Sequence, residues 1–377
     1  MRQDFRPYPE LDRLLQKAVP ISLDHASRVV VFSDLHLGDG GRNDEFLHNS
    51  SLFETVLEQH YLARRCGLVL NGDIEELMKF SCGSIEKAWE RLYDLFRRFA
   101  GEASFWKIYG NHDLGLLDEE GYQLAPWLVE SLAFRFGTDT ILLFHGHQAS
   151  PFLREPCSII ARSLFYLLRY IAKPAGIRNY SVSYKSRKRY VIEKAAYEFS
   201  NRAGIISIIG HTHRPLFESL SKVDALNYRI EELCRAYPAA GQDRRSCIED
   251  EIGHLKDELD ACYRKGFRKS LRSGRYGNIT IPSIFNSGCA IGKRGMTAIE
   301  IEDGMIRLVY WHNGRIEGKK REKSGGMEEL GSSGYFRMVL NEDRLDYVFS
   351  RIRLLARSHG KPVGKIAGEF NSCPTFT

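Results

Sequence analysis

The sequence of 377 residues predicts an α/β fold, and three of its features support this prediction. Short β-branched and apolar runs alternate with longer stretches of helical periodicity, as expected for sheets covered by helices. Polar residues follow directly after these runs, which is where α/β sheets bind ligands. After residue 277 the pattern changes to the alternation of antiparallel strands, with Asp303-Gly304 as a turn signal.

The core strands are predicted at 28–33, 67–71, 104–109, 140–144 and 205–209, with helices over 44–64 and 84–100 between them. Each strand ends at a polar residue or at a glycine that precedes one. A chain of this length can bury a substantial core.

The composition is that of an ordinary soluble globular protein, with 43% hydrophobic and 27% charged residues. The net charge of +6 permits an anionic substrate or membrane surface and does not favour nucleic acid. Neither a secretory signal nor a membrane-spanning segment is expected. The eight cysteines form no Cys-x-x-Cys pair, which argues against a zinc knuckle or a disulfide framework. These features predict a cytoplasmic protein.

Five short motifs follow the predicted strands: Asp34-x-His36, Gly72-Asp73, Gly110-Asn111-His112-Asp113, His145 and Gly210-His211-Thr212-His213. A carboxylate can bridge two divalent ions and offset their charge, and imidazoles suit manganese, iron or zinc better than calcium or magnesium. Residues two apart in a strand point the same way, so each Asp-x-His or His-x-His pair is expected to converge. The motifs therefore predict a metal centre.

In this order the motifs resemble those of the metallophosphoesterase (calcineurin-like) superfamily, over roughly residues 28–313. The resemblance implies a four-layer sandwich of two mixed β-sheets flanked by helices. It also implies a hydrolase in which metal-activated hydroxide cleaves a phosphoester or pyrophosphate bond. The expected cofactors are two divalent ions (manganese, iron or zinc, with manganese favoured). By the same resemblance the ligands are Asp34, His36, Asp73, Asn111, His145, His211 and His213, with Asp73 bridging.

The resemblance also implies a catalytic role for His112, which would contact phosphate or protonate the leaving oxygen. Glu76 is expected to orient it, although a surface position for Glu76 is equally compatible with the sequence. His147 competes with His145 as a ligand. We favour His145 and expect His147 to line the substrate pocket or to bond a ligand. Asn43 is a further predicted substrate contact, or else part of a plain Gly-rich turn.

Residues 152–200 form a segment that is both basic and apolar, with ten Lys or Arg and three Glu, a net charge of +7. Arg162 and Arg169 are seven apart and share a helical face, and with Arg187 they are predicted to bind substrate. Such a helix can lie on an anionic membrane, here the inner face of the cell membrane, or pack against the core.

The position of this segment resembles the lid of UDP-2,3-diacylglucosamine pyrophosphatases, as does the start SDLHLG. The resemblance implies an amphipathic UDP-sugar-lipid-like or other lipid-linked phosphate substrate. His112 stands where that family commonly has Arg. A soluble phosphodiesterase or phosphatase acting on nucleotides, nucleic acid or phosphoprotein is the alternative, and a non-catalytic metal-bound scaffold is another.

The predicted organisation is a metallophosphoesterase domain over 1–316, containing the lid insert 152–200 and a helical hairpin insert over 218–272. The hairpin is expected to pack on the domain or to join copies of the chain into a homo-oligomer. A C-terminal extension over 317–377 is predicted to carry one helix, around 341–358.

Overall fold

A computed structural model describes residues 8–150, 186–218, 222–264, 281–293, 295–314 and 327–355. The predicted strands and the following antiparallel hairpin are present, within one or two residues of their predicted bounds. The strands are β1 (Val19–Leu23), β2 (Val29–Phe32), β3 (Gly67–Asn71), β4 (Phe105–Ile108), β5 (Leu128–Val129), β6 (Leu132–Phe136), β7 (Asp139–Leu143), β8 (Ile206–Ile209), β9 (Ile284–Asn286), β10 (Met296–Glu302), β11 (Met305–His312), β12 (Met327–Glu329) and β13 (Phe336–Arg344).

The described α-helices are α1 (Pro9–Lys17), α2 (Ser50–Val56), α3 (Cys82–Ala88), α4 (Glu90–Glu102), α6 (Ser186–Ala203), α7 (Lys222–Ala236), α8 (Gln242–Arg264) and α9 (Leu345–Leu355). Shorter helical turns lie at Leu47–Asn49, Leu57–Leu62, Leu114–Asp118, Ala125–Trp127, His147–Ala149 and Tyr237–Ala239. The helix expected over 84–100 is broken at Trp89, whose indole donates to the carbonyl of Gly38. Among the described residues, no helix is both long and apolar enough to cross a membrane.

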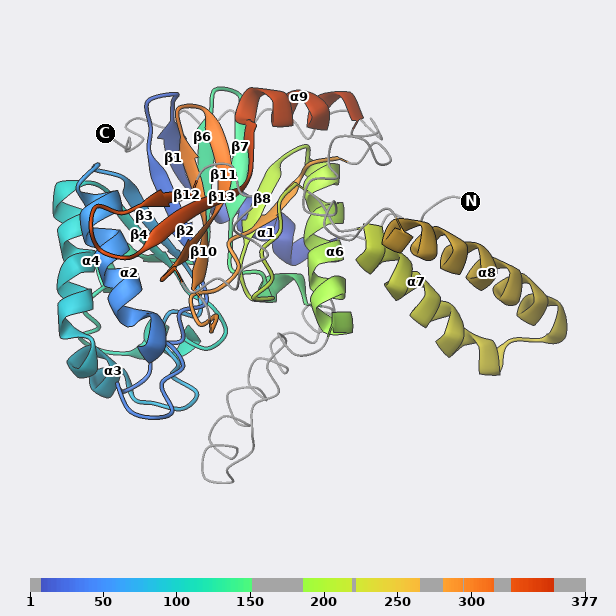
Figure 1. The fold of residues 1–377 in the computed structure, drawn as a ribbon, viewed down its shortest axis with the longest axis horizontal. Helices are drawn as coiled ribbons and strands as arrows, with labels where there is room; N and C mark the ends of the chain where they lie inside the picture. The colour runs from blue at the N-terminus through green and yellow to red at the C-terminus, as the bar shows by residue number, and fades with distance from the viewer. Residues whose placement is uncertain are drawn as a thin grey trace.

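The described strands form two mixed sheets, as the resemblance implied (Figure 1). One has the order β1-β6-β7-β8-β9, and the other has the order β12-β13-β11-β10-β2-β3-β4-β5. In the second sheet β2 to β5 are parallel, and β10, β11, β13 and β12 are antiparallel. β9 pairs parallel with β8, so only β10 and β11 form the hairpin expected after residue 277.

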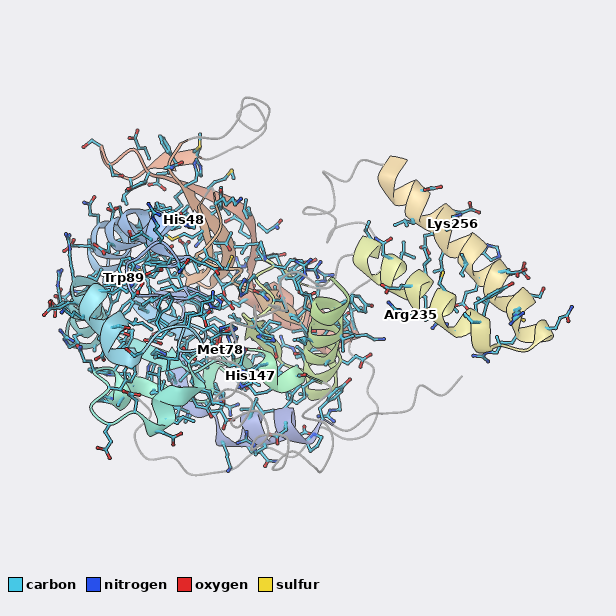
Figure 2. The ribbon with its side chains drawn as sticks, turned by 90° about the horizontal axis from the view of Figure 1, so that it is seen from below. His48, Met78, Trp89, His147, Arg235 and Lys256 are labelled. Atoms are coloured by element: carbon cyan, nitrogen blue, oxygen red, sulfur yellow. The ribbon has the colours of Figure 1, made fainter. Side chains whose placement is uncertain are left out.

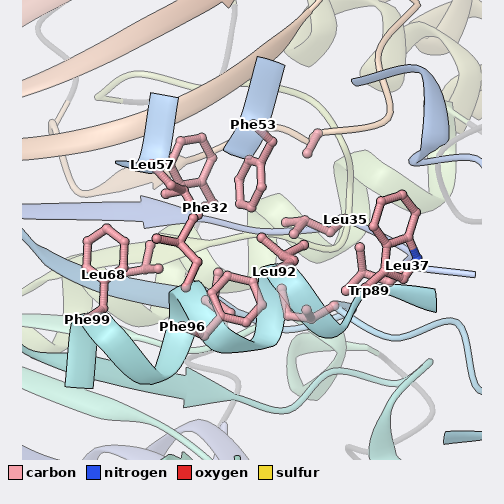
Figure 3. Packing of buried hydrophobic residues seen from close by; sticks show 14 of the residues in the cluster. Phe32, Leu35, Leu37, Phe53, Leu57, Leu68, Trp89, Leu92, Phe96 and Phe99 are labelled. Atoms are coloured by element: carbon pink, nitrogen blue, oxygen red, sulfur yellow. The ribbon is translucent and has the colours of Figure 1, made fainter. Parts of the chain in front are cut away.

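Three buried apolar clusters separate four layers. Side chains alternate along β2, so Val31 faces the other sheet while Phe32 faces helices α2 and α4. Figure 3 shows this helix-facing cluster, in which Phe53 of α2 and Phe96 of α4 pack around Phe32. A third cluster joins α1 and α6 to the outer face of the five-stranded sheet. The four-layer arrangement expected from the resemblance is therefore present.

The C-terminal segment adds more structure than the single helix predicted there. β13 pairs with β11 along most of its length, and α9 begins where β13 ends. Residues 341–344, predicted as helix, belong to this strand. Local periodicity misses it because the strand is half exposed and is stabilised by a partner some 30 residues earlier in the chain. The eight-stranded sheet thus continues past residue 316, where a boundary was predicted.

Helices α7 and α8 are present where the helical hairpin was predicted. They pack against each other and project away from the sheets (Figure 2), with Arg235 of α7 and Lys256 of α8 well separated from the main body. Most of the described side chains of α8 are exposed.

Candidate metal centre

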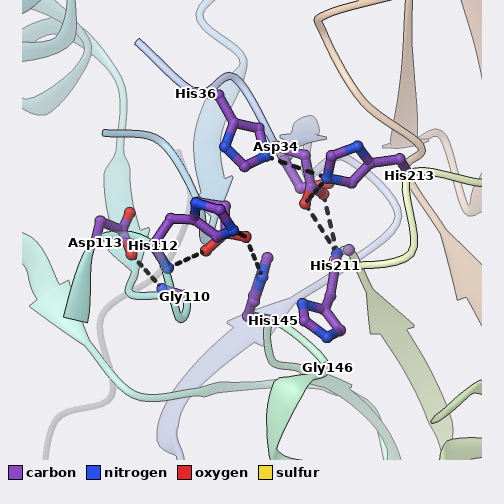
Figure 4. Close-up of polar contacts among 12 residues, drawn as sticks. Asp34, His36, Gly110, His112, Asp113, His145, Gly146, His211 and His213 are labelled. Atoms are coloured by element: carbon purple, nitrogen blue, oxygen red, sulfur yellow. Dashed lines mark hydrogen bonds and ion pairs between the residues drawn. The ribbon is translucent and has the colours of Figure 1, made fainter. Parts of the chain in front are cut away.

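The predicted ligands lie at one edge of the two sheets, because four strands end in the same way. Asp34, Asp73, His145 and His211 each follow the last residue of their strand by two positions, after β2, β3, β7 and β8. These strands belong to two different sheets that face each other, so their carboxyl ends bring residues from four segments together. Figure 4 shows the resulting cluster.

Five of the seven predicted ligands have a backbone in the left-handed region. Their φ values are 55° at Asp34, 50° at His36, 52° at Asp73, 63° at His211 and 53° at His213. A non-glycine residue in this region costs about 1–3 kcal/mol, and such strain gathers at functional sites. The expectation that strand alternation aims the Asp-x-His and His-x-His pairs was wrong. Both pairs lie beyond the ends of the strands, and their left-handed backbone directs the side chains toward the metal centre.

Two motif glycines are required by close contacts within the cluster. A Cβ on Gly110 would lie 2.1 Å from Oδ1 of Asp73. A Cβ on Gly72, whose φ is +82°, would lie 2.3 Å from Nδ1 of His145. Any larger residue at either position would displace a predicted ligand.

Two groups of predicted metal ligands are brought together, and a third group of potential ligand atoms combines His36 with Glu76 and His112. In each group the three ligand atoms lie within 4.8 Å of one another: Asp34, His36 and His213 in the first, and Asp73, His145 and His211 in the second. In the first group His213 Nε2 lies 3.1 Å from both Asp34 Oδ1 and His36 Nε2. In the second, His145 Nε2 lies 3.1 Å from Asp73 Oδ2. The seventh predicted ligand, Asn111, has a buried Oδ1 without a hydrogen-bond partner. This set of donors fits divalent metal ions.

Hydrogen bonds fix which nitrogen each of two histidines can offer to a metal. His145 donates from Nδ1 to the carbonyl of Asn71, at 2.9 Å. His36 donates from Nδ1 to Glu76, at 3.1 Å. Nε2 of both rings therefore remains available as a ligand atom.

Glu76 is buried, so the alternative of a surface charge does not apply to it. Its carboxylate lies 2.9 Å from Nδ1 of His112 and 3.1 Å from Nδ1 of His36. One acid thus orients a predicted ligand and the predicted catalytic histidine. His112 presents its Nε2 to the centre, 3.9 Å from Oδ2 of Asp73.

The charges of the cluster shift the pKa values of its members. Burial opposes protonation of His112, but the negative charge of Asp73 and the hydrogen bond to Glu76 outweigh it and raise the pKa to about 9. Burial would raise the pKa of Asp73, but the charges of His145 and His112 hold it well below its usual value. Burial and the charge of His145 lower the pKa of His147 to about 3.

Of the predicted substrate-binding residues that the structure describes, only His147 is placed beside the predicted metal ligands. The ring centroid of His147 lies 5.6 Å from that of His145 and 6.4 Å from that of His211, and its Nδ1 is buried without a partner. Asn43 is exposed and makes no side-chain hydrogen bond among the described residues. Arg162, Arg169 and the side chain of Arg187 lie outside the described residues.

Sequence reasoning did not single out two charged residues of helix α6. Arg189 is half-buried near the start of α6, and its Nε is buried without a hydrogen-bond partner. Glu193, one turn further along, contacts the loop that carries His211 and His213. Nothing in the sequence separates these two from the other charged residues of a basic segment. A pocket of about 360 Å³ also opens beside His213 and is lined in part by Lys293 and Tyr310.

The sandwich and its clustered acids and histidines define a metal-dependent hydrolase. Residues 27–215 match the family model described as calcineurin-like phosphoesterase. The chain belongs to the calcineurin-like phosphoesterase family and is a metal-dependent phosphoesterase that uses divalent metal ions.

The chain is also similar to two solved structures. A single mutant of Vps29 from Entamoeba histolytica is 14% identical, with 76% of this chain and 93% of that chain covered and a TM-score of 0.33. A conserved uncharacterized protein from Streptococcus pneumoniae TIGR4, a predicted phosphoesterase, is 16% identical, with 76% and 89% covered and a TM-score of 0.25. No curated protein matches the chain.

Proposed function

We propose that this enzyme hydrolyses a phosphoester or diphosphate bond at a centre of two divalent metal ions, with manganese as the best ion. The observation that supports this most strongly is the convergence of two groups of acid and histidine ligand atoms, each within 4.8 Å. Asp34, His36 and His213 would hold one ion, and Asn111, His145 and His211 the other, with Asp73 between them. A bound pair of such ions supplies Lewis acidity and a water activated for attack on phosphorus.

His112 is proposed as the proton donor to the leaving oxygen. The Glu76 carboxylate favours the protonated imidazole and holds Nδ1 so that Nε2 faces the centre. An imidazolium held in this position can release its proton to an alkoxide or phosphate leaving group as negative charge develops there. The complete ligand set together with this dyad argues against a non-catalytic scaffold.

For the substrate we propose an amphipathic, lipid-linked phosphate, of which a UDP-sugar-lipid-like diphosphate is one example. The support is the charge of +7 within the apolar segment 152–200, which ends in helix α6. Arg189 and His147 would bind its phosphate oxygens, since both have buried nitrogens without partners. The pocket beside His213, with the cation of Lys293 and the ring of Tyr310, offers room for the group esterified to the phosphate. A soluble nucleotide or phosphoprotein ester is the competing substrate.

A substrate panel tests this proposal. The manganese-loaded protein is assayed with p-nitrophenyl phosphate, bis-p-nitrophenyl phosphate, UDP-sugars, and UDP-sugars that carry acyl chains. Hydrolysis that is fastest for acylated diphosphates supports the lipid-linked substrate, and preference for any ester without an acyl chain contradicts it. Absence of turnover on all of them contradicts the proposed hydrolysis itself.

Peripheral contact with the cytoplasmic face of a membrane is the corresponding proposal for location. Flotation with vesicles of anionic phospholipid at low salt should recover the protein in the lipid fraction, while vesicles of neutral phospholipid should not. Protein that stays in solution with both vesicles contradicts membrane contact.

We also propose that helices α7 and α8 join copies of the chain. Light scattering should give a multiple of the 43.2 kDa chain mass, falling to one chain when residues 222–264 are replaced by a short Gly-Ser linker. A single-chain mass for both proteins contradicts the assembly.

A further inference from the structure

Helix α6 lies between β7 and β8 in the chain, the two strands of the five-stranded sheet that are followed by predicted metal ligands. It links β7 to β8, which run parallel to each other, so the helix runs antiparallel to both strands. Its first turns therefore lie near the edge at which β7 and β8 end in His145 and Gly210-His211. This topology places charged residues of α6 beside the predicted ligands.

Glu193 is fully buried on this helix and faces the loop after β8. Its Oε1 accepts a hydrogen bond from Thr212 Oγ1 at 2.8 Å and another from Arg214 Nε at 3.2 Å. Its Oε2 accepts from the second arm of the Arg214 guanidinium. A buried carboxylate is tolerated only with such partners, so this contact holds the helix and the loop in a fixed relation.

Thr212 lies between two predicted metal ligands and is fixed from both sides. Asn286 donates from Nδ2 to Thr212 Oγ1 and to the carbonyl of Gly210, both at 2.9 Å. A hydroxyl has one hydrogen to donate, and Thr212 gives it to Glu193 while accepting from Asn286. His211 and His213 on either side both have left-handed backbones, which persist only where the surroundings hold them.

We infer that Glu193 is a positioning residue for the metal centre: through Thr212 it holds the loop that aims His211 and His213 at the metal ions. The inference rests on the proposed metal centre. Loss of the hydrogen bond between Thr212 and Glu193 would let the left-handed backbone of the loop relax and would displace the imidazoles of His211 and His213. The affinity for metal ions would then fall. Residues that orient metal ligands typically change metal affinity by 10–100-fold when replaced.

The test measures manganese affinity of the full chain by equilibrium dialysis and elemental analysis, alongside kcat and KM for bis-p-nitrophenyl phosphate. Glu193→Gln and Thr212→Val should each weaken manganese binding by about 10–100-fold. Thr212→Ser keeps the hydroxyl and should bind manganese as the wild type does. Glu198→Gln, a half-exposed acid on the same helix, is the matched control and should leave the affinity unchanged.

The possible outcomes distinguish the positioning role of Glu193 from the proposed metal centre. If the wild type binds manganese and the folded Glu193→Gln and Thr212→Val variants bind it equally well, Glu193 has no positioning role. If Glu193→Gln fails to fold, Thr212→Val against Thr212→Ser decides by the same comparison. A wild type that binds no manganese overturns the metal centre, and the positioning role with it.

Discussion

Lys107 Nζ and the carboxylate of Asp113 form an ion pair of 3.0 Å in which both side chains are fully buried. Glu75, also fully buried, lies 2.8 Å from the same ammonium group. Asp113 also accepts hydrogen bonds from the backbone N–H groups of Ile74 and Gly110. This pair therefore connects the two loops that carry Asp73 and Asn111.

Replacing Lys107 by Met should destabilise the protein strongly. It would leave two carboxylates buried without a cation, and breaking a buried pair in this way costs about 3–5 kcal/mol. Urea unfolding followed by circular dichroism measures the change. The exposed Lys87 provides the control, because Lys87→Met should stay within about 0.5 kcal/mol of the wild type. Equal stability of the two variants would contradict the stabilising role of Lys107.

Replacing His112 by Ala should lower kcat by about 100- to 10,000-fold, the usual contribution of a positioned acid. The manganese content should stay that of the wild type, because His112 belongs to neither predicted ligand set. Steady-state kinetics and elemental analysis on the same preparation measure both quantities. His254→Ala, on the exposed side of α8, is the control. Wild-type kcat in His112→Ala would remove the proton-donor role.

Replacing Arg189 by Gln should raise KM more than it lowers kcat. Its guanidinium is proposed to bind phosphate oxygens in the substrate as well as in the transition state, and uniform binding of this kind appears in KM. Lys194→Gln removes one positive charge from the same helix and serves as the control, with unchanged constants. If the two variants behave alike, Arg189 does not contact the substrate.

The stability of the metal-free protein should show a contribution from His60 that depends on pH. Burial lowers the pKa of His60 to about 4 from an ordinary value of 6.5, so the folded state keeps it neutral. Below pH 6.5 the unfolded chain binds a proton that the folded chain does not, and stability falls as the pH drops toward 4.

The measurement is the difference in unfolding free energy between the wild type and His60→Gln across pH 4 to 8. The wild type should lose stability relative to the variant as the pH falls from 6.5 to 4, and the difference should be constant above about 7. A difference that does not change with pH would show that His60 titrates normally in the folded state.

The sequence predicted the strands and the acids and histidines that gather beyond their ends, because both are local signals. A run such as 67–71 is apolar over most of one strand, and Asp73 lies two positions after it. Ligand geometry was not predictable in the same way. The left-handed backbone of Asp34, His36, His211 and His213 depends on contacts with distant segments, such as the bond from the His211 N–H to the carboxylate of Asp34.

Long-range packing also explains the other differences. β13 is half exposed and has weak alternation of its own, and its place is set by pairing with β11. Glu193 looks like any acid of an amphipathic helix until the fold places Thr212 against it. Glu76 was predicted from the resemblance to orient His112, but its second bond, to His36, was not foreseen, because no local pattern shows that the loops after β2 and β3 meet.

The dinuclear metal centre is tested by the amount of manganese bound per chain after dialysis, measured by elemental analysis for the wild type and for Asp73→Asn. We expect close to two ions per wild-type chain and fewer in the variant, because Asp73 would bind both. A wild type that retains no manganese, iron or zinc, or an Asp73→Asn variant that retains as much metal as the wild type, would contradict it.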